Sequence, residues 1–385
     1  MAHSVALRGY QATSVSDVIR LAGVSRTTFY ELFANKHDCF LAAYETMSYR
    51  MIKNIHGSCR SCGGDWLRAL NSAFDALRAE VMCETSAARM VIFEAPPAGP
   101  DAIQRSRKVR GVFEHMLQQI LSLSPAGPAI SCTLVKALTG GVRSVLHPRL
   151  YPGNLPELDA ATYELALWAL AYHAPEAEAD RKLNHCSTQS RSNSELLGGY
   201  PSSPQARALA RECAQGGGSQ ARPAGARDVV IDRFHEAAER GCRSVDWIAE
   251  QAPAWPTELG ESIRALACFI AVNPSFGRMS FAEISKPGPE IGARTHELFG
   301  EFRALLERGR ELSEPPRSAI ACEAVAGAVW ESIHHHVSLG RTHSFAELSE
   351  ELTYIALAPF TGSREARRLL SQRMGSSRQA QSAVA

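Results

Sequence analysis

The chain has 385 residues with 41 basic and 40 acidic side chains, which gives a formal net charge of +1. At roughly 150 residues per domain this length corresponds to two or three domains, and the composition (45% hydrophobic, 21% charged) is typical of a folded globular protein. The balanced charge excludes proteins that coat nucleic acid or anionic membranes by bulk electrostatics. Any nucleic-acid contact must therefore come from a small local patch.

The start of the chain and the distribution of its cysteines indicate the cellular compartment. Residues 1–8 contain no apolar run of secretory length, and no stretch reaches the roughly 18 uncharged apolar residues that a membrane span needs. Ten cysteines are scattered along the chain, a pattern that favours buried thiols in a reducing compartment over disulfides. Cys83, Cys132 and Cys268 lie on apolar stretches and are predicted to pack. We expect a cytoplasmic protein with no membrane partner.

The first predicted elements are two short helices joined by a tight turn, within the segment GYQATSVSDVIRLAGVSRTTFYELFANK at residues 9–36. Ser14 is placed as an N-cap, and Asp17 completes a short variant of the capping box. Gly23 supplies the turn, because a residue free to adopt positive φ costs least there, and Ser25 can cap the second helix. The residues predicted to point inward are Val15, Val18, Ile19 and Ala22 from the first helix and Phe29, Leu32 and Phe33 from the second.

The second of these helices has the character of a DNA recognition helix. Arg26, Thr27 and Tyr30 share the face opposite the apolar residues. Arg26 would read a guanine through a bidentate contact, and Thr27 or Thr28 would touch a thymine methyl group or a phosphate. Tyr30 and Lys36 are better placed for backbone phosphates.

The surrounding segment is weakly basic. Residues 1–55 carry six Lys or Arg against four Asp or Glu, which is enough for a DNA-binding module that works in pairs. The candidate DNA-binding residues are Thr13, Ser14, Ser25, Arg26, Thr27, Thr28, Tyr30 and Lys36.

The run Gly-Tyr-x-Ala-Thr-Ser-Val through Ala-Gly-Val-Ser-x-x-x-Phe-Tyr-x-x-Phe-x-x-Lys resembles the N-terminal DNA-binding domain of TetR-family transcriptional regulators. The strong resemblance covers about the first 45 residues, and a tryptophan opening the predicted fifth helix resembles the family's divergent ligand-binding domain more loosely. The resemblance implies a dimeric, all-α repressor whose C-terminal domain binds a small molecule. Ligand binding in that family re-spaces the two DNA-binding heads and releases operator DNA.

Besides the internal repeat described below, the chain departs from the family's pattern at its first helix and at two residues. The family's first helix starts well before the Gly-Tyr pair, whereas eight residues precede Gly9, so either the true start lies upstream or the first helix buttresses the domain poorly. Leu32 stands where the family usually has a histidine or tyrosine, and His37 where a glutamate is common.

The remainder of the chain reads as helical. Apolar residues recur at steps of three and four at residues 67–81, 112–120, 298–306 and 348–356, whereas alternating strand patterns are absent. We therefore predict an all-α fold. Residues 371–385 are polar and aperiodic, which predicts a disordered tail.

An internal repeat organises the chain. When the sequence is aligned with itself, one constant offset places Trp66 on Trp255 and Gly99-Pro100 on Gly288-Pro289, and an offset longer by a single position aligns the flanking segments. We interpret the chain as a tandem duplication whose second DNA-binding head is degenerate, because the segment that would form its recognition helix contains Gly216-Gly217-Gly218. The predicted domains are a helix-turn-helix three-helix DNA-binding domain at 1–45, a helical ligand-binding domain at 46–182, a degenerate head and loop-rich linker at 183–225, a second helical regulatory domain at 226–370, and a disordered tail at 371–385.

The predicted regulatory domains offer few chemical motifs. Trp66, Phe74 and Phe93 are candidates for lining a ligand cavity, and plain bundle core is their alternative and more frequent role. Cys59-x-x-Cys62 lacks a second pair at zinc-finger spacing, so we predict no metal site. Nothing resembles a nucleophile elbow or a phosphate-binding loop, and we predict neither a cofactor nor enzymatic activity.

The leading hypothesis is a sequence-specific transcriptional repressor that a small-molecule effector releases from palindromic double-stranded operator DNA. With one working head per chain, two chains would act as a homodimer, each holding its two regulatory domains as an intrachain pseudo-dimer. The alternative is a helical small-molecule-binding or interaction protein that has lost DNA binding.

Overall fold

The computed structural model describes residues 1–124, 130–151, 157–173, 254–278, 289–341 and 344–382. All regular structure in these ranges is helical and no strand occurs in them, which confirms the all-α prediction. No helix of the described part is long and apolar enough to cross a membrane. The predicted degenerate head and linker, residues 183–225, lie outside the described residues.

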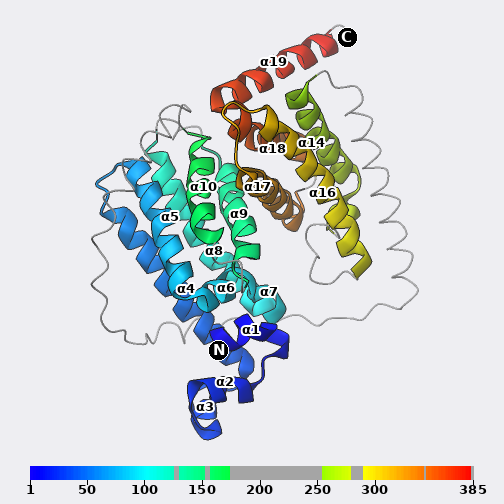
Figure 1. Cartoon of the computed structure of the whole chain (residues 1–385). Helices are drawn as coiled ribbons and strands as arrows, with labels where there is room; N and C mark the ends of the chain where they lie inside the picture. Colours follow the sequence, from blue (N-terminus) through cyan, green and yellow to red (C-terminus); the bar gives the residue numbers. More distant parts are fainter. Residues whose placement is uncertain (125–129, 152–156, 174–253, 279–288, 342–343, 383–385) are drawn as a thin grey trace, which may run out of the picture.

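Three short helices form an N-terminal head that lies below the rest of the molecule in Figure 1. On the first of them Val5 is fully buried, and Tyr10 packs edge-on against Phe40 with ring centroids 4.9 Å apart. The short first helix is thus anchored in the core of the helices behind it, and the expectation of a poorly buttressed domain is not met. The three helices are α1 (Ala2–Ala12), α2 (Val15–Ala22) and α3 (Arg26–Leu32).

The helices of residues 36–173, which we call the first half, follow directly from the head. The long helix α4 connects the two, and α5 begins at Trp66, as predicted from the resemblance. The helices of this half are α4 (Lys36–Arg60), α5 (Trp66–Cys83), α6 (Thr85–Phe93), α7 (Ala95–Ala98), α8 (Pro100–Ser122), α9 (Cys132–Arg149) and α10 (Leu158–Leu170).

The helices of residues 254–382, which we call the second half, repeat this spacing in part. The offset that places Trp66 on Trp255 also places the last residue of α5 on the last residue of α14, and the first residue of α8 on the first of α16. Both α5 and α14 open on a tryptophan. The helices of the second half are α14 (Trp255–Val272), α15 (Pro274–Gly277), α16 (Pro289–Leu312), α17 (Ala319–Ser338), α18 (Phe345–Thr361) and α19 (Ser363–Ser382).

The last helix corrects the prediction of a disordered tail from residue 371. The helix α19 continues without interruption from Ser363 to Ser382. The prediction relied on the absence of apolar periodicity, but arginine, glutamine, methionine and alanine have high intrinsic helix propensity. Once a helix has started at Ser363, each further residue that becomes ordered also forms one backbone hydrogen bond. The end of the helix therefore does not need an apolar face.

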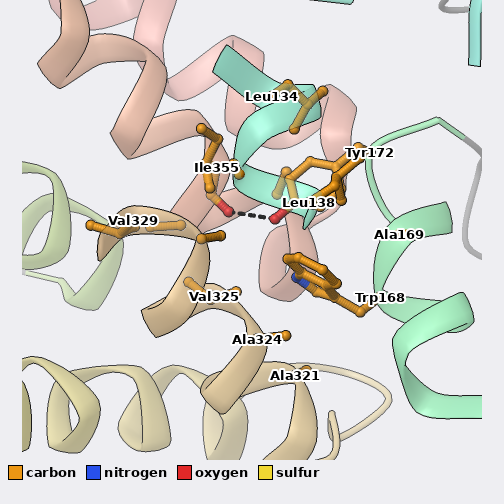
Figure 2. Close-up of a cluster of buried hydrophobic side chains, with 14 of the residues drawn as sticks. Leu134, Leu138, Trp168, Ala169, Tyr172, Ala321, Ala324, Val325, Val329 and Ile355 are labelled. Carbon is orange, nitrogen blue, oxygen red and sulfur yellow. Dashed lines mark hydrogen bonds between the residues drawn. The ribbon is translucent and has the colours of Figure 1, made fainter. Parts of the chain in front are cut away.

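The two halves share one hydrophobic core, which forms where α9 and α10 meet α17 and α18. Figure 2 shows Leu138 of α9 and Trp168 of α10 close to Val325 of α17. Tyr172, just after α10, donates a hydrogen bond from its hydroxyl to the carbonyl oxygen of Ile355 on α18 at 2.8 Å. Because these side chains are buried by residues of the opposite half, neither half has a complete core alone.

The helices α9 and α17 cross with their backbones nearly in contact. A Cβ added at Gly140 would lie 2.3 Å from the Cβ of Glu331 and 3.3 Å from the carbonyl oxygen of Gly327. A Cβ added at Gly327 would lie 2.2 Å from the Cβ of Ser144 and 3.3 Å from the carbonyl oxygen of Gly140. The contacts are reciprocal, because Gly140 and Gly327 are separated by the same number of positions as Ser144 and Glu331. This separation is two positions shorter than the one between Trp66 and Trp255. Reciprocity of this kind is the property of a two-fold interface.

The crossing predicts opposite effects for two glycine-to-alanine substitutions. Gly140→Ala should lower the free energy of unfolding by about 1–3 kcal/mol, because the added methyl group overpacks the contact with Glu331. Gly111→Ala on the exposed face of α8 is the matched control, since nothing lies within 4 Å of its added Cβ. It should stabilise the protein by about 0.5–1 kcal/mol. Urea unfolding measures both, and a Gly140→Ala variant as stable as the control would contradict the close crossing.

Candidate functional site

The turn between α2 and α3 has the local structure that the sequence predicts. The backbone N–H of Asp17 donates to the Ser14 hydroxyl at 3.2 Å, and the backbone N–H of Ser14 donates to the Asp17 carboxylate at 3.1 Å, which completes the capping box. Gly23 ends α2 in the left-handed conformation with φ of 67°. Ser25 caps α3 by accepting the backbone N–H of Thr28 at 3.0 Å. These caps satisfy backbone donors that would otherwise have no partner at the two helix starts.

The Asp17 carboxylate links α2 to α1. It accepts the Ser14 hydroxyl at 2.7 Å, and it pairs with Arg8 of α1 at 3.2 Å and with Arg20 at 2.8 Å. The hydrogen bonds from Ser14, followed by the charges of Arg8 and Arg20, hold the pKa of Asp17 below its usual range. The contribution of this carboxylate to stability is therefore present above its ordinary pKa and is lost only as the pH falls through the lowered value.

The inner side of the head differs from the prediction at two positions. Leu32 is 67% exposed and Ala22 is also exposed, although both were expected to point inward. Each is the last residue of its helix, and the chain becomes extended at Phe33, which packs against the core of the head as expected. The small core consists of Val18, Phe29 and Cys39, with Val15, Ile19 and Phe33 packed against it.

The outward side of α3 presents the residues expected of a recognition helix. Arg26, Thr27 and Tyr30, which we call the α3 face, are all exposed, and the Tyr30 ring packs edge-on against Phe29 at 5.4 Å. Arg26 donates to the Ser16 hydroxyl on α2 at 3.0 Å, which directs its guanidinium along the exposed side of the turn. Ser14 and Ser25 are also exposed, and the half-buried Thr28 hydroxyl contacts that of Ser25 at 2.9 Å.

Two predicted DNA contacts lie elsewhere in the head. Thr13 is buried, and its hydroxyl donates to the carbonyl oxygen of Gly9 at 2.8 Å. Lys36 is half-buried: its Nζ donates to the carbonyl oxygen of Tyr10 at 3.0 Å and lies 4.3 Å from the centroid of the Tyr10 ring. The last carbonyls of α1 have no partner within the helix, and a cation is favourable at that end. Both side chains therefore bind backbone carbonyl oxygens at the end of α1 and do not lie on the α3 face.

Comparison with known families decides what this head is. Residues 2–43 match the model of the bacterial regulatory proteins of the tetR family. The head is therefore similar to the DNA-binding domain of that family. The match covers α1, α2, α3 and the start of α4, and it supports a role for this head in DNA-binding transcription regulation. A search of curated proteins finds no match to the chain.

The head contacts the first half at more points than the α4 junction. Gln11 of α1 donates to the carbonyl oxygen of Pro97 in α7 at 2.7 Å. The imidazole of His37 lies 3.6 Å from the Asp101 carboxylate at the start of α8 and 3.3 Å from the Tyr10 hydroxyl. The orientation of the head thus depends on where α7 and the start of α8 lie.

A cavity of about 190 Å³ lies within the first half, between α4, α5, α6, α8 and α9. Phe74, one of the three candidates for lining a ligand cavity, is among its lining residues. Trp66 and Phe93 are not, because Trp66 packs edge-on against His173 at 6.0 Å and Phe93 packs against His147 at 4.5 Å. The lining residues are mainly apolar: Ile55, Leu70, Ala73, Phe74, Leu77, Val91, Ile92, Val109, Phe113, Met116, Leu117, Ile120, Val142 and Leu146, with Tyr44, Ser106, Arg110, Thr139 and Arg143 as the polar members.

The two cavity arginines are held by a carboxylate of the second half. Arg110 and Arg143 both donate to Glu331 of α17, the latter at 3.0 Å. Burial alone would raise the pKa of Glu331, but the charges of Arg143 and Arg110 together lower it, so the carboxylate is ionised. This cluster was not predicted from the sequence. The available signal was the single carboxylate within the apolar run AVAGAVWESI of α17.

The burial of three cysteines differs from the prediction. Cys83, Cys132 and Cys268 are exposed and do not pack, because each lies on the outward side of its helix or at its end. The Cys59 thiol donates to the carbonyl oxygen of Ala69, and burial raises its pKa. Within the described ranges no three His, Cys, Asp or Glu side chains gather so that they could hold a metal ion.

The position of Lys36 predicts that it stabilises the head in the absence of DNA. Lys36→Met should lower the local stability of α1 and α3 by about 1–2 kcal/mol, because a charge-assisted hydrogen bond to the end of α1 is lost. Hydrogen exchange of the head amides in the free protein measures this loss. Lys108→Met, at an exposed position on α8, is the control and should leave those rates unchanged. Equal rates in both variants would show that Lys36 is not bound to α1.

Proposed function

We propose that the protein is a cytoplasmic, sequence-specific transcriptional repressor that a small amphipathic molecule releases from its operator. The observation that carries this proposal is the exposed α3 face on a fully capped helix-turn-helix. The Arg26 guanidinium suits the two acceptors that guanine presents in the major groove. Thr27 suits a thymine methyl group or a phosphate, and Tyr30 suits a backbone phosphate.

The two halves are proposed to be copies produced by tandem duplication, docked as an intrachain pseudo-dimer. Two independent features support this. The helix pairs α5 with α14 and α8 with α16 start at one common offset along the chain, and the contacts of Gly140 and Gly327 are reciprocal. A bundle of α9, α10, α17 and α18 then takes the place that a dimer interface would have in a protein with one copy per chain.

A chain built in this way presents one head in its described part, so two chains are proposed to bind one palindromic operator. Half-sites should lie about 34–36 Å apart, or at a multiple of that distance. Footprinting combined with light scattering of the protein–DNA complex tests this arrangement. Two chains per protected palindrome are expected, whereas a tight complex of one chain with one operator would contradict it.

Effector release is proposed to act through α8. The middle of this helix lines the cavity with Ser106 and Arg110, and its first turn carries Asp101, the partner of His37. A ligand that displaces α8 would move Asp101 relative to α4, and the head would follow through His37 and Tyr10. Such coupling needs only that the ligand prefer one of the two positions of the helix.

The α3 face predicts a specific loss of DNA binding. After selection of bound genomic fragments, Arg26→Ala should weaken operator affinity by about 1–3 kcal/mol and relax the base preference at one position. Tyr30→Ala should weaken binding to all sequences. Arg60→Ala, which removes the same charge from the exposed far end of α4, is the matched control and should have little effect.

A salt titration distinguishes the regulator from the alternative function. Operator affinity should fall steeply with salt, because phosphate contacts release counterions. Binding that is insensitive to both Arg26→Ala and Tyr30→Ala would favour the alternative, a helical small-molecule-binding protein without a DNA-reading function.

A further inference from the structure

The cavity of the first half carries an unbalanced charge. Arg110 and Arg143 line it, and the carboxylate that holds them both is Glu331. Two guanidinium groups therefore face one carboxylate, which leaves an excess of one positive charge beside an otherwise apolar space. The nearby Lys136 adds nothing to this excess, because Glu114 pairs with it at 2.6 Å.

The neighbouring histidine does not change this balance. Burial, together with the positive charge of Lys136, lowers the pKa of His335 to about 4, so its imidazole is neutral at pH 7. The Arg110 and Arg143 side chains are 27% and 40% exposed, so water reaches the excess cation, and an anion that enters the cavity would replace this water and pair with the charge. The hydrogen bonds among the described residues use one nitrogen of each guanidinium, so other N–H donors remain for a second anion.

We propose that the cavity binds an amphipathic anion, with its apolar tail among the side chains of α5, α8 and α9 and its carboxylate on Arg110 and Arg143. Glu331 competes for the same guanidinium groups. The inference rests on the proposed function, in which this cavity is the effector site. It defines the effector as a carboxylate with a medium-length hydrocarbon chain rather than a neutral or cationic molecule.

The position of Glu331 connects such a ligand to the junction between the halves. Its Cβ lies at the α9–α17 crossing, where it meets Gly140. The residue that corresponds to it across the reciprocal contact is Ser144, which carries no charge. An anion bound to Arg143 and Arg110 weakens their ion pairs with Glu331. Among the described residues, Glu331 is the only carboxylate of α17 that pairs with these two arginines. The affinity of the cavity for its ligand therefore depends on the contact of α17 with the first half.

The test is calorimetric titration of the full-length protein, without DNA, with octanoate, 1-octanol and octylammonium. These probes share one chain and differ in charge. Octanoate should bind at least about tenfold more tightly than 1-octanol, as expected for one charge-assisted hydrogen bond, and octylammonium more weakly than either. Equal affinity for octanoate and 1-octanol would overturn the proposal.

Three variants assign the anion to its partners. Arg143→Gln should weaken octanoate binding by about tenfold or more while leaving 1-octanol unchanged. Glu331→Gln should strengthen octanoate binding, because a competitor is removed. Arg107→Gln, at an exposed position on α8 outside the lining, is the control and should change neither. Octanoate binding that survives Arg143→Gln unchanged would overturn the proposal. Because the Arg143 side chain is already 40% exposed, this variant remains informative even where Glu331→Gln does not fold.

Operator binding is measured separately in the presence of octanoate. Octanoate that binds as expected and leaves DNA affinity unchanged upholds the ligand class but contradicts effector release. Octanoate that releases DNA from the wild type and not from Arg143→Gln supports both.

Discussion

The close contact between α9 and α17 is the constraint on which the rest of the molecule depends. It requires glycine at positions 140 and 327, because a Cβ at either would overlap the opposite helix. Backbones that approach so closely bring Trp168 and Tyr172 of one half into contact with α17 and α18 of the other, and the result is a single core. The same contact brings Glu331 to the cavity arginines. Without it the first half would be an incomplete bundle with two unpaired guanidinium groups.

The head depends on the same body for its orientation. Its own core is small, and much of its order comes from polar links: Asp17 joins α2 to α1, and Lys36 closes the end of α1. Contacts of Gln11 with α7 and of His37 with α8 then fix the head against the first half. A small domain that relies on its neighbours in this way is suited to be repositioned by them. This property fits the proposed regulator without requiring any change within α3 itself.

Local features of the chain were predictable from the sequence, because they depend on neighbouring residues. The caps at Ser14 and Ser25 and the left-handed Gly23 follow from side chains within three or four positions. The apolar periodicity of α5 and α8 predicts their buried sides, except at Val112, which is exposed. Features that depend on distant residues were not predictable. The pairing of Arg110 with Glu331 spans 221 positions, and nothing in the local pattern marks Lys36 as turned toward α1. Trp66 and Phe93 were assigned to the cavity by residue type, but ring contacts with His173 and His147 place them elsewhere.

The central claim is that the two halves close on each other within one chain. Hydrogen exchange of the backbone amides of α9 and α17, followed by mass spectrometry across a wide range of protein concentration, tests it most directly. We expect slow exchange in both helices at rates that do not depend on concentration, because the partner of each helix belongs to the same chain. Exchange that accelerates on dilution would show that α9 pairs with α17 of another chain. Fast exchange at every concentration would show that the crossing does not form.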